Sequence, residues 1–255
     1  MDILDQYKQH YQSVLHDFEI FLNYVQAHKP ALTPVQGLVP VKHILKIMES
    51  FLVKETSEEK VRERIFRKRF EDEFPRFYFL DLLAVNAKIL SIRQNKLAIG
   101  KYFKKYFEMP AFFRPTGLFF NFCFDFNHEA WFAGGDFGLT VMLKAPFIWN
   151  RILSWRKEKE VLWEEWAKRV IKECALTWTA ENQSFSERSM IWGLKSCFVD
   201  TLGYLGVVEQ IKKEGKYGPE LHAVRLTPWG QVCLKQLEEM LTKRPSQQSD
   251  FFSLS

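Results

Sequence analysis

The chain has 255 residues, of which 47% are hydrophobic and 26% are charged, and it carries a net charge of +5 at pH 7. This length gives one large domain or two to three small modules, and the 24 Phe and 8 Trp favour packed cores over disorder. The mild positive charge permits an anionic partner without requiring one.

The sequence predicts neither a signal peptide nor a membrane span. Residues Met1 to Asp5 are acidic and lack the basic start and apolar stretch of a signal peptide. The most apolar run, Ala111 to Phe126, is interrupted by polar and charged residues. The four cysteines lie far apart among apolar neighbours, so we expect reduced core residues in a cytoplasmic protein. They are Cys123, Cys174, Cys197 and Cys233.

The first third of the chain shows helical periodicity. Apolar residues three and four apart predict a helix over residues 1–29 and a second from about Val41 to Val53. Pro30 and Pro34 separate the two helices. Residues 57–73 alternate acids and bases, which suits either a nucleic-acid stripe or a solvated helix face with i,i+4 ion pairs. We favour the solvated helix.

The middle of the chain predicts a hairpin followed by an aromatic block. An apolar helix from Phe77 to Leu90 leads to two short apolar stretches around a Gln-Asn turn, which predict a hairpin over residues 91–99. A helix from about Lys101 to Glu108 follows. Residues 103–137 hold 11 Phe, at spacings that fit a strand or a helix, and we favour a helix. This block is expected to be core or a partner groove rather than a base-stacking surface.

The last third predicts helices around a second hairpin. Residues 139–178 have a helical pattern that Pro146 is expected to break, and residues 187–206 form another apolar helix. Strands are predicted from Val207 to Ile211 and from Leu221 to Leu226. Thr227 and Pro228 then have the preferred order for the start of a helix, which extends to about Lys243.

The order of apolar helix, hairpin and helix occurs twice, which indicates two winged-helix units. In both, a Leu-x-Val/Ile stretch, a turn and a Leu-x-Leu/Ile stretch precede the last helix. The first unit has Gly100 and Lys101 in place of Thr227 and Pro228. We therefore expect a mainly α, tandem winged-helix fold with two short β-hairpin wings. The expected parts are residues 1–133, a connector over 134–186, a C-terminal unit over 187–243 and a disordered tail over 244–255.

These motifs resemble the uncharacterised bacterial proteins built of tandem winged-helix units, including the module found beside plasmid pRiA4b ORF-3-like domains. In them a phrase such as Leu-Thr-Pro-x-Gly follows each hairpin, as Leu226 to Gly230 does here. The stretches 32–38 and 41–45 are similar to the opening of that module. The resemblance covers residues 20–130 and 187–243, and it implies the fold but no functional residue, because that family has no settled activity.

A winged helix that reads DNA places bases or amides on the helix before the wing. Here residues 77–90 offer only Asn86 and Lys88, and residues 189–205 offer Lys195 opposed by Asp200. The second wing is richer in bases, and a wing can contact phosphate, although hairpin turns also carry Lys for solubility. The nucleic-acid candidates are Lys212, Lys213, Lys216 and Arg225.

A catalytic or metal signature is not found, and no cofactor is predicted. His128, Glu129 and Asp136 are a possible acid–base or metal group, although a polar loop end explains them as well. The leading hypothesis is a non-catalytic binding protein that uses its winged units as a scaffold, with a protein partner or weak nucleic-acid contact and no membrane. The first alternative is a DNA-binding regulator that uses the C-terminal wing, and the second is an enzyme with a site near His128.

Overall fold

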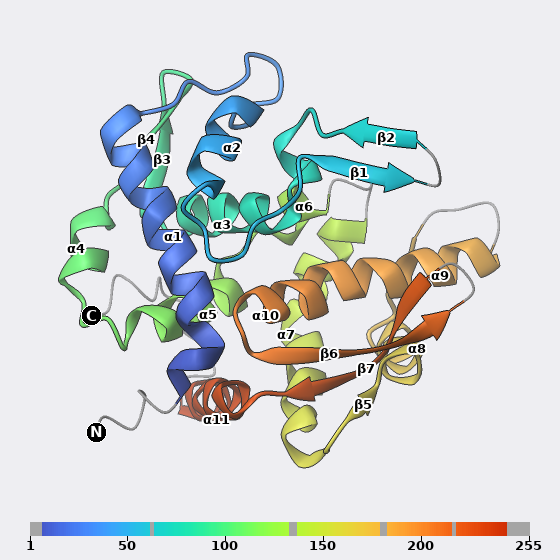
Figure 1. Cartoon of the computed structure of the whole chain (residues 1–255). Coiled ribbons are helices and arrows are strands. Elements are labelled where there is room, and N and C mark those ends of the chain that lie inside the picture. Colours follow the sequence, from blue (N-terminus) through green and yellow to red (C-terminus); the bar gives the residue numbers. More distant parts are fainter. Residues whose placement is uncertain (1–6, 62–63, 133–136, 179–182, 216–217, 244–255) are drawn as a thin grey trace. The chain divides into compact units, whose positions relative to one another are not determined.

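The computed structural model describes residues 7–61, 64–132, 137–178, 183–215 and 218–243. The fold is mainly α with small antiparallel sheets (Figure 1). The described residues group into two compact units that divide between Phe126 and Asn127. The described part of the expected connector, residues 137–178 and 183–186, belongs to the second unit together with the C-terminal hairpin. The expected tail, residues 244–255, lies outside the described residues.

The first unit contains most of the elements that the sequence predicts. Its elements are α1 (Lys8–His28), α2 (Val41–Met48), β1 (Glu58–Val61), β2 (Arg64–Arg67), α3 (Pro75–Asn86), β3 (Leu90–Arg93), β4 (Lys96–Ile99), α4 (Phe103–Glu108) and α5 (Arg114–Phe124). Apart from the helix over residues 57–73, the predicted helices and the predicted hairpin over residues 91–99 are present, although the helix predicted to reach Leu90 ends at Asn86. The second helix ends at Met48 instead of Val53.

Aromatic rings form the core of the first unit. Phe18 of α1 contacts Tyr106 of α4 at 5.6 Å between ring centroids, and Phe79 of α3 contacts Phe122 of α5 at 5.7 Å. The predicted helix in the aromatic block is confirmed by α5, whose Phe119 and Phe122 are fully buried. Within the first unit the block is therefore core, which follows from the large apolar area that each ring removes from water.

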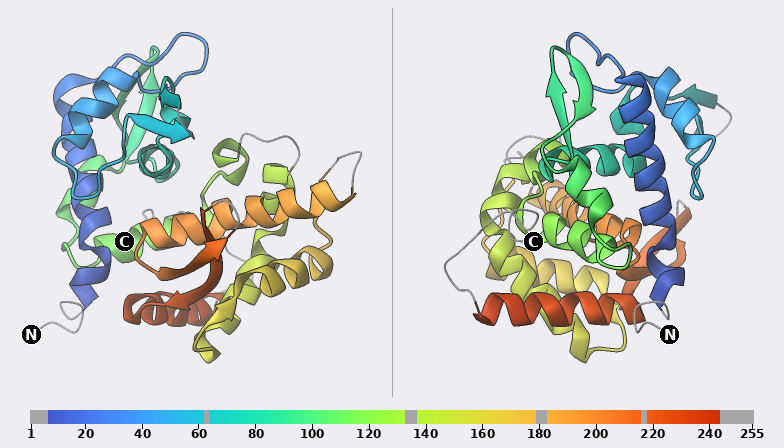
Figure 2. Two further views of the ribbon diagram at one scale, coloured as in Figure 1. Left: turned by 45° about the vertical axis from the view of Figure 1, so that its right-hand side comes forward. Right: turned by 90° about the vertical axis from the view of Figure 1, so that its left-hand side faces the viewer.

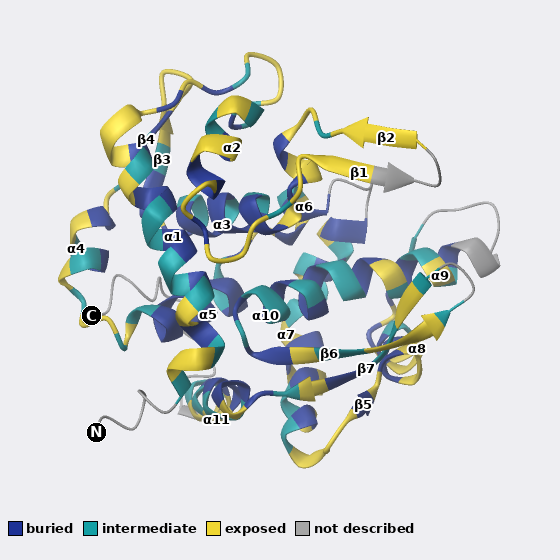
Figure 3. Cartoon of the chain, in the orientation of Figure 1, coloured by how far each residue is buried: buried dark blue, intermediate teal, exposed yellow. Residues whose placement is uncertain are grey.

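The helix expected over residues 57–73 is wrong: residues 58–61 and 64–67 are the paired strands β1 and β2. Glu58 lies opposite Arg67 across the two strands, and Arg67 Nε is 3.2 Å from Glu58 Oε1. The alternating charges that would pair along a helix can pair equally well between strands, so their spacing does not choose between the two structures. All of β2 is exposed, including Ile65 and Phe66 (Figure 3).

The hairpin β3–β4 is hydrogen-bonded to the segment that follows α1. Its two-residue turn, Gln94-Asn95, has positive φ at both positions, as a type I′ turn requires. Leu32 N–H donates to the Asn95 carbonyl at 2.9 Å, and the Asn95 side-chain amide donates to the Leu32 carbonyl at 3.1 Å. Ala31 also forms an isolated antiparallel bridge with Lys96, so this segment acts as a third strand beside β4.

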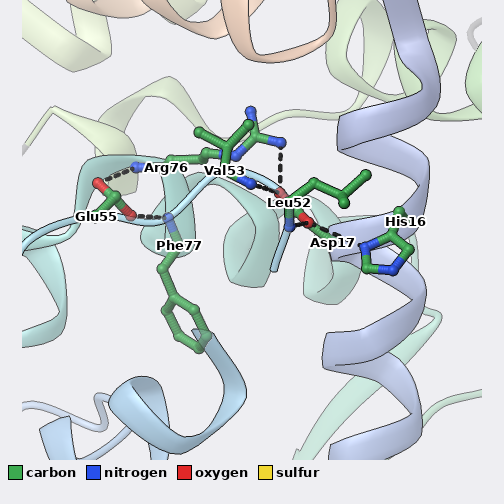
Figure 4. Close-up of polar contacts among 7 residues, drawn as sticks. All are labelled: His16, Asp17, Leu52, Val53, Glu55, Arg76 and Phe77. Carbon is green, nitrogen blue, oxygen red and sulfur yellow. Dashed lines mark hydrogen bonds and ion pairs between the residues drawn. The ribbon is translucent and has the colours of Figure 1, made fainter. Parts of the chain in front are cut away.

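A buried ion pair ties α1 to the start of α3 (Figure 4). Asp17 Oδ2 is 2.8 Å from Arg76 Nη2, and both side chains are almost fully buried. The same carboxylate accepts hydrogen bonds from the N–H groups of Leu52 (2.7 Å) and Val53 (3.3 Å). Asp17 thus satisfies three donors from two other segments, which fixes the chain between α2 and β1 against α1.

Two further carboxyl groups, Glu71 and Asp81, are buried against each other. Glu71 accepts a hydrogen bond from Val39 N–H. Burial raises the pKa of Asp81 to about 6, and burial together with the neighbouring Asp81 raises the pKa of Glu71 well above its usual range. Both shifts have the same cause: a charged carboxylate is poorly solvated at this position.

We expect the first unit to lose stability as the pH rises through about 6. Between the pKa of 3.8 that is usual for Asp and about 6, the folded state retains a proton that the unfolded state has released. The stabilisation that this proton gives is therefore complete below pH 3.8 and lost above pH 6. Because one pKa unit corresponds to roughly 1.4 kcal/mol, the free energy of unfolding falls by about 3 kcal/mol over this range. In urea unfolding at pH 4.5 and pH 7.5, the Asp81→Asn variant should gain stability over the parent at the higher pH. A constant difference at both pH values would contradict this.

The second unit builds a three-stranded sheet between helices. Its elements are α6 (His128–Trp131), α7 (Phe137–Leu153), a 3-10 turn (Ser154–Lys157), β5 (Val161–Leu162), α8 (Trp163–Glu173), α9 (Gln183–Leu194), a π-helical segment (Lys195–Asp200), α10 (Thr201–Tyr204), β6 (Val208–Gly215), β7 (Gly218–Leu226) and α11 (Pro228–Lys243). The sheet order is β5-β7-β6, and all pairs are antiparallel (Figure 1). Figure 2 shows the long β6–β7 hairpin, in orange, from two further sides.

Two details of the second unit differ from the prediction. Pro146 lies inside α7 and does not end it, because Val141 on one side and Ile148 on the other are buried and hold the helix together. The strand β5 was not predicted, since two residues are too few to show a periodic pattern.

The predicted cap is confirmed: Thr227 Oγ1 accepts from Gly230 N–H at 2.9 Å and donates to the Gly206 carbonyl at 2.7 Å.

The same backbone connection precedes and follows the hairpin in both units. Before the hairpin, a residue with positive φ ends the helix: Lys88 (φ 55°) after α3 and Gly206 (φ 71°) after α10. After the hairpin, Gly100 N–H donates to Ile89 O, as Thr227 N–H donates to Val207 O. Ile89 therefore corresponds to Val207.

Candidate binding surfaces

The helix α7 carries an exposed apolar stripe. Leu139, Leu143 and Phe147 follow one another at intervals of four residues and are 39%, 67% and 61% exposed. This spacing places all three on one face of the helix. The other side of α7 packs into the core of the second unit through Val141, Ile148, Trp149 and Ile152. The helix is thus apolar on two sides, and the described residues cover only one of them.

The sequence itself carries a signal for this stripe. A surface helix normally has one apolar face, and a helix that is apolar all round is buried or covered by a partner. Residues 137–153 contain no acid and only two bases, Lys144 and Arg151. Arg151 pairs with Glu173, and Lys144 lies over the Phe147 ring, 5.9 Å from its centroid.

The C-terminal wing, residues 208–226, brings together only part of the predicted basic group. Lys212 and Lys213 are exposed on β6, and Lys216 lies outside the described residues. Arg225 on β7 is held by Glu160 at 2.5 Å, and Glu209 lies 3.8 Å away. The two strands also carry Glu214 and Glu220, the latter opposite Lys213. Acids therefore offset the bases among the described residues of this wing.

The structure does not place His128 as a solvent-accessible acid or base. His128 is 2% exposed, its ring lies 5.1 Å from that of Phe198, and burial lowers its pKa to about 3. The imidazole is therefore neutral at physiological pH and shielded from solvent. Glu129 is exposed, and Asp136 lies outside the described residues. The geometry gives no support to catalysis by this group.

Other chemistry-bearing groups are also accounted for by the fold. Over the described ranges, no cluster of three or more His, Cys, Asp or Glu side chains could hold a metal ion. The four cysteines are buried, as predicted, and burial raises the pKa of the Cys174, Cys197 and Cys233 thiols. Glu55 beside β1 has a pKa raised by burial, but it accepts the N–H groups of Arg76 and Phe77 and so caps α3.

Comparisons with known proteins add no name to these surfaces. No family model, no curated protein and no solved structure matches the chain. Among the residues that the structure describes, no helix combines the length and the apolar character needed to cross a membrane.

Proposed function

We propose that the chain is a non-catalytic binding protein built from two winged-helix units, and that it binds a protein partner on the apolar stripe of α7. The observation that carries this proposal is the stripe Leu139, Leu143 and Phe147, which exposes large side chains on a helix whose other side is core. Exposed apolar patches of this kind mark interaction surfaces.

The order of elements supports the winged-helix assignment in the second unit. A winged helix has a helix, a short strand, two more helices and a hairpin whose second strand pairs with the first short strand. The second unit has α7, β5, α8, α9 to α10, β6 and β7 in this order, with β7 between the other two strands.

The first unit supports the same assignment with one addition. The order is α1, Ala31, α2, α3, β3 and β4. Ala31 forms a bridge with Lys96 of β4, and in this it corresponds to β5, which pairs with β7 in the second unit. The hairpin β1–β2 is then an insertion between α2 and α3. This order agrees with the proposed kinship to bacterial tandem winged-helix proteins.

The helices before the wings do not favour sequence-specific DNA binding. Residues along most of α3 are buried, among them Phe77, Phe79, Leu80 and Leu83. In the second unit, Lys195 is held by both oxygens of Asp200 at 2.7 and 2.8 Å. DNA binding through the C-terminal wing remains the alternative proposal, and it is supported by Lys212 and Lys213.

The partner that fits the stripe is an amphipathic helix. Side chains four residues apart along α7 make a narrow apolar row, which matches the apolar row of a second helix packed alongside it. A photo-crosslinking residue at position 143 should therefore capture a partner. The same residue at position 172, an exposed lysine on α8, is the matched control.

Replacing Phe147 by Glu should abolish crosslinking from position 143 and leave the fold intact. The side chain is largely exposed, so the free energy of unfolding should change by less than about 0.5 kcal/mol. Lys172→Gln lowers the net charge by the same amount on α8 and should preserve the crosslink. Equal crosslinking from positions 143 and 172, or a crosslink that survives Phe147→Glu, would refute the proposal.

A further inference from the structure

Two segments of the first unit contain no acidic residue. Residues 20–48 have three lysines and two histidines, and residues 82–107 have five lysines and one arginine, without a single Asp or Glu in either segment. Elsewhere in the first unit, acids and bases are mixed. The net charge of the whole chain does not reveal these two segments, because acids in other segments offset their bases.

The fold joins the two segments at one end of the first unit. Ala31 bridges Lys96, and Leu97 N–H donates to the Pro30 carbonyl at 3.0 Å. Tyr24 of α1 and His43 of α2 are joined by a 2.8 Å hydrogen bond between Tyr24 Oη and His43 Nδ1. The C-terminal end of α1, the helix α2 and the β3–β4 turn consequently lie at the same end (Figure 1).

Five bases are exposed there: Lys29, Lys42, Lys46, Arg93 and Lys96. We refer to these five residues as the basic end. No acidic side chain of the described chain forms an ion pair with any of them. The nearest acids along the chain are Glu49, which follows α2, and Glu19, which is paired with Arg114 at 2.7 Å.

The titration of His43 reports the same positive field. Its pKa is lowered first by burial and then by the positive charges of Lys42, His28 and Lys46. A histidine whose charged neighbours all lower its pKa lies in a region where cations are not neutralised.

We propose that the basic end binds the phosphodiester backbone of double-stranded nucleic acid without reading its sequence. Unneutralised Lys and Arg side chains on a wing and on two adjoining helices supply the contacts that phosphates require. Base reading is not part of this site, because α3 is buried and contributes no exposed row of amides or bases. The proposal concerns the first unit alone, so it does not depend on a protein partner at α7.

The test is binding of two fluorescently labelled 20-base-pair duplexes of unrelated sequence, measured by anisotropy at several salt concentrations. The variant combines Lys42→Gln, Lys46→Gln, Arg93→Gln and Lys96→Gln. It should bind at least tenfold more weakly than the parent, and its slope of log affinity against log salt should be shallower by roughly 3. The two duplexes should bind the parent with similar affinity.

The matched control removes four exposed lysines from the second unit that lie outside the C-terminal wing: Lys157→Gln, Lys159→Gln, Lys172→Gln and Lys235→Gln. It changes the net charge by the same amount and should bind within about twofold of the parent. Equal losses in both variants, or a loss in the control alone, would overturn the assignment. The unfolding of each variant is compared with that of the parent. A double variant that combines Lys42→Gln and Lys46→Gln is the milder second variant.

An anionic membrane is the alternative that the experiment must separate, because Val35 and Ile92 are exposed beside the bases. Vesicles of phosphatidylcholine with phosphatidylserine serve as the probe. Vesicle binding without duplex binding would overturn the proposal, as would the absence of duplex binding at low salt.

Discussion

Replacing Gly230 by alanine should destabilise the second unit by about 3 kcal/mol or more. A Cβ at this position would lie 2.0 Å from the Val207 carbonyl oxygen, which is backbone and cannot move aside without breaking the turn before β6. The second unit contains all eight tryptophans of the chain. Urea unfolding followed by tryptophan fluorescence therefore measures this effect directly.

Two other glycines complete the experiment. Gly100→Ala would place a Cβ 2.4 Å from the Lys88 carbonyl oxygen, so it should destabilise the first unit in the same way. Six of the eight tyrosines lie in that unit, and near-ultraviolet circular dichroism reports their packing. Gly203→Ala is the control, because its nearest contact would be an ordinary 3.5 Å to the Gln210 side chain. If Gly230→Ala unfolds at the same urea concentration as Gly203→Ala, the close approach at Val207 is wrong.

Replacing Asp17 by alanine should destabilise the first unit by about 3 to 5 kcal/mol. The change leaves the buried Arg76 guanidinium without its carboxylate, and two backbone N–H groups, of Leu52 and Val53, lose their acceptor. The tyrosine signal in urea unfolding should show the shift.

The chain offers a matched control for the ion pair. Glu58→Ala breaks the exposed pair with Arg67 on the β1–β2 hairpin, and exposed pairs contribute less than about 1 kcal/mol. The Asp17 variant should therefore unfold at a clearly lower urea concentration than the Glu58 variant. Equal midpoints would mean that the Asp17–Arg76 pair does not hold α1 to α3.

Local patterns predicted the elements whose residues determine their own conformation. The apolar stripe of α1, the Gln94-Asn95 turn and the Thr227-Pro228 helix start all appear where the sequence places them. Each of these signals depends on residues within about one helical turn or one hairpin of each other.

Predictions failed where the deciding contact is distant in sequence. The charges of residues 57–73 satisfy a helix and a hairpin alike, so only their surroundings select β1–β2. The strand β5 exists because Val161 and Leu162 pair with Val224 and Ala223, about 60 residues away. The basic end has the same origin, since the hydrogen bonds and the bridge between residues 30–32 and 95–97 join its two segments.

The apolar stripe of α7 could be predicted from the sequence, whereas the positive charge of the C-terminal wing was overestimated. Apolar residues on two sides of residues 137–153 could have indicated a covered face. The four predicted bases of the C-terminal wing were counted without the acids that face them, such as Glu160, which holds Arg225.

The turn of the β3–β4 hairpin is held by hydrogen bonds, and this lowers the conformational entropy that a ligand would have to remove when it binds at the basic end. Asn95 is held at its backbone carbonyl and at its side-chain amide by Leu32, so the tip that carries Arg93 and Lys96 is already ordered before a ligand arrives. Ordering a loose loop on binding subtracts from affinity, whereas a preorganised tip loses only the freedom of its side chains. A short, fixed wing can therefore bind with fewer contacts than a long, mobile one would need.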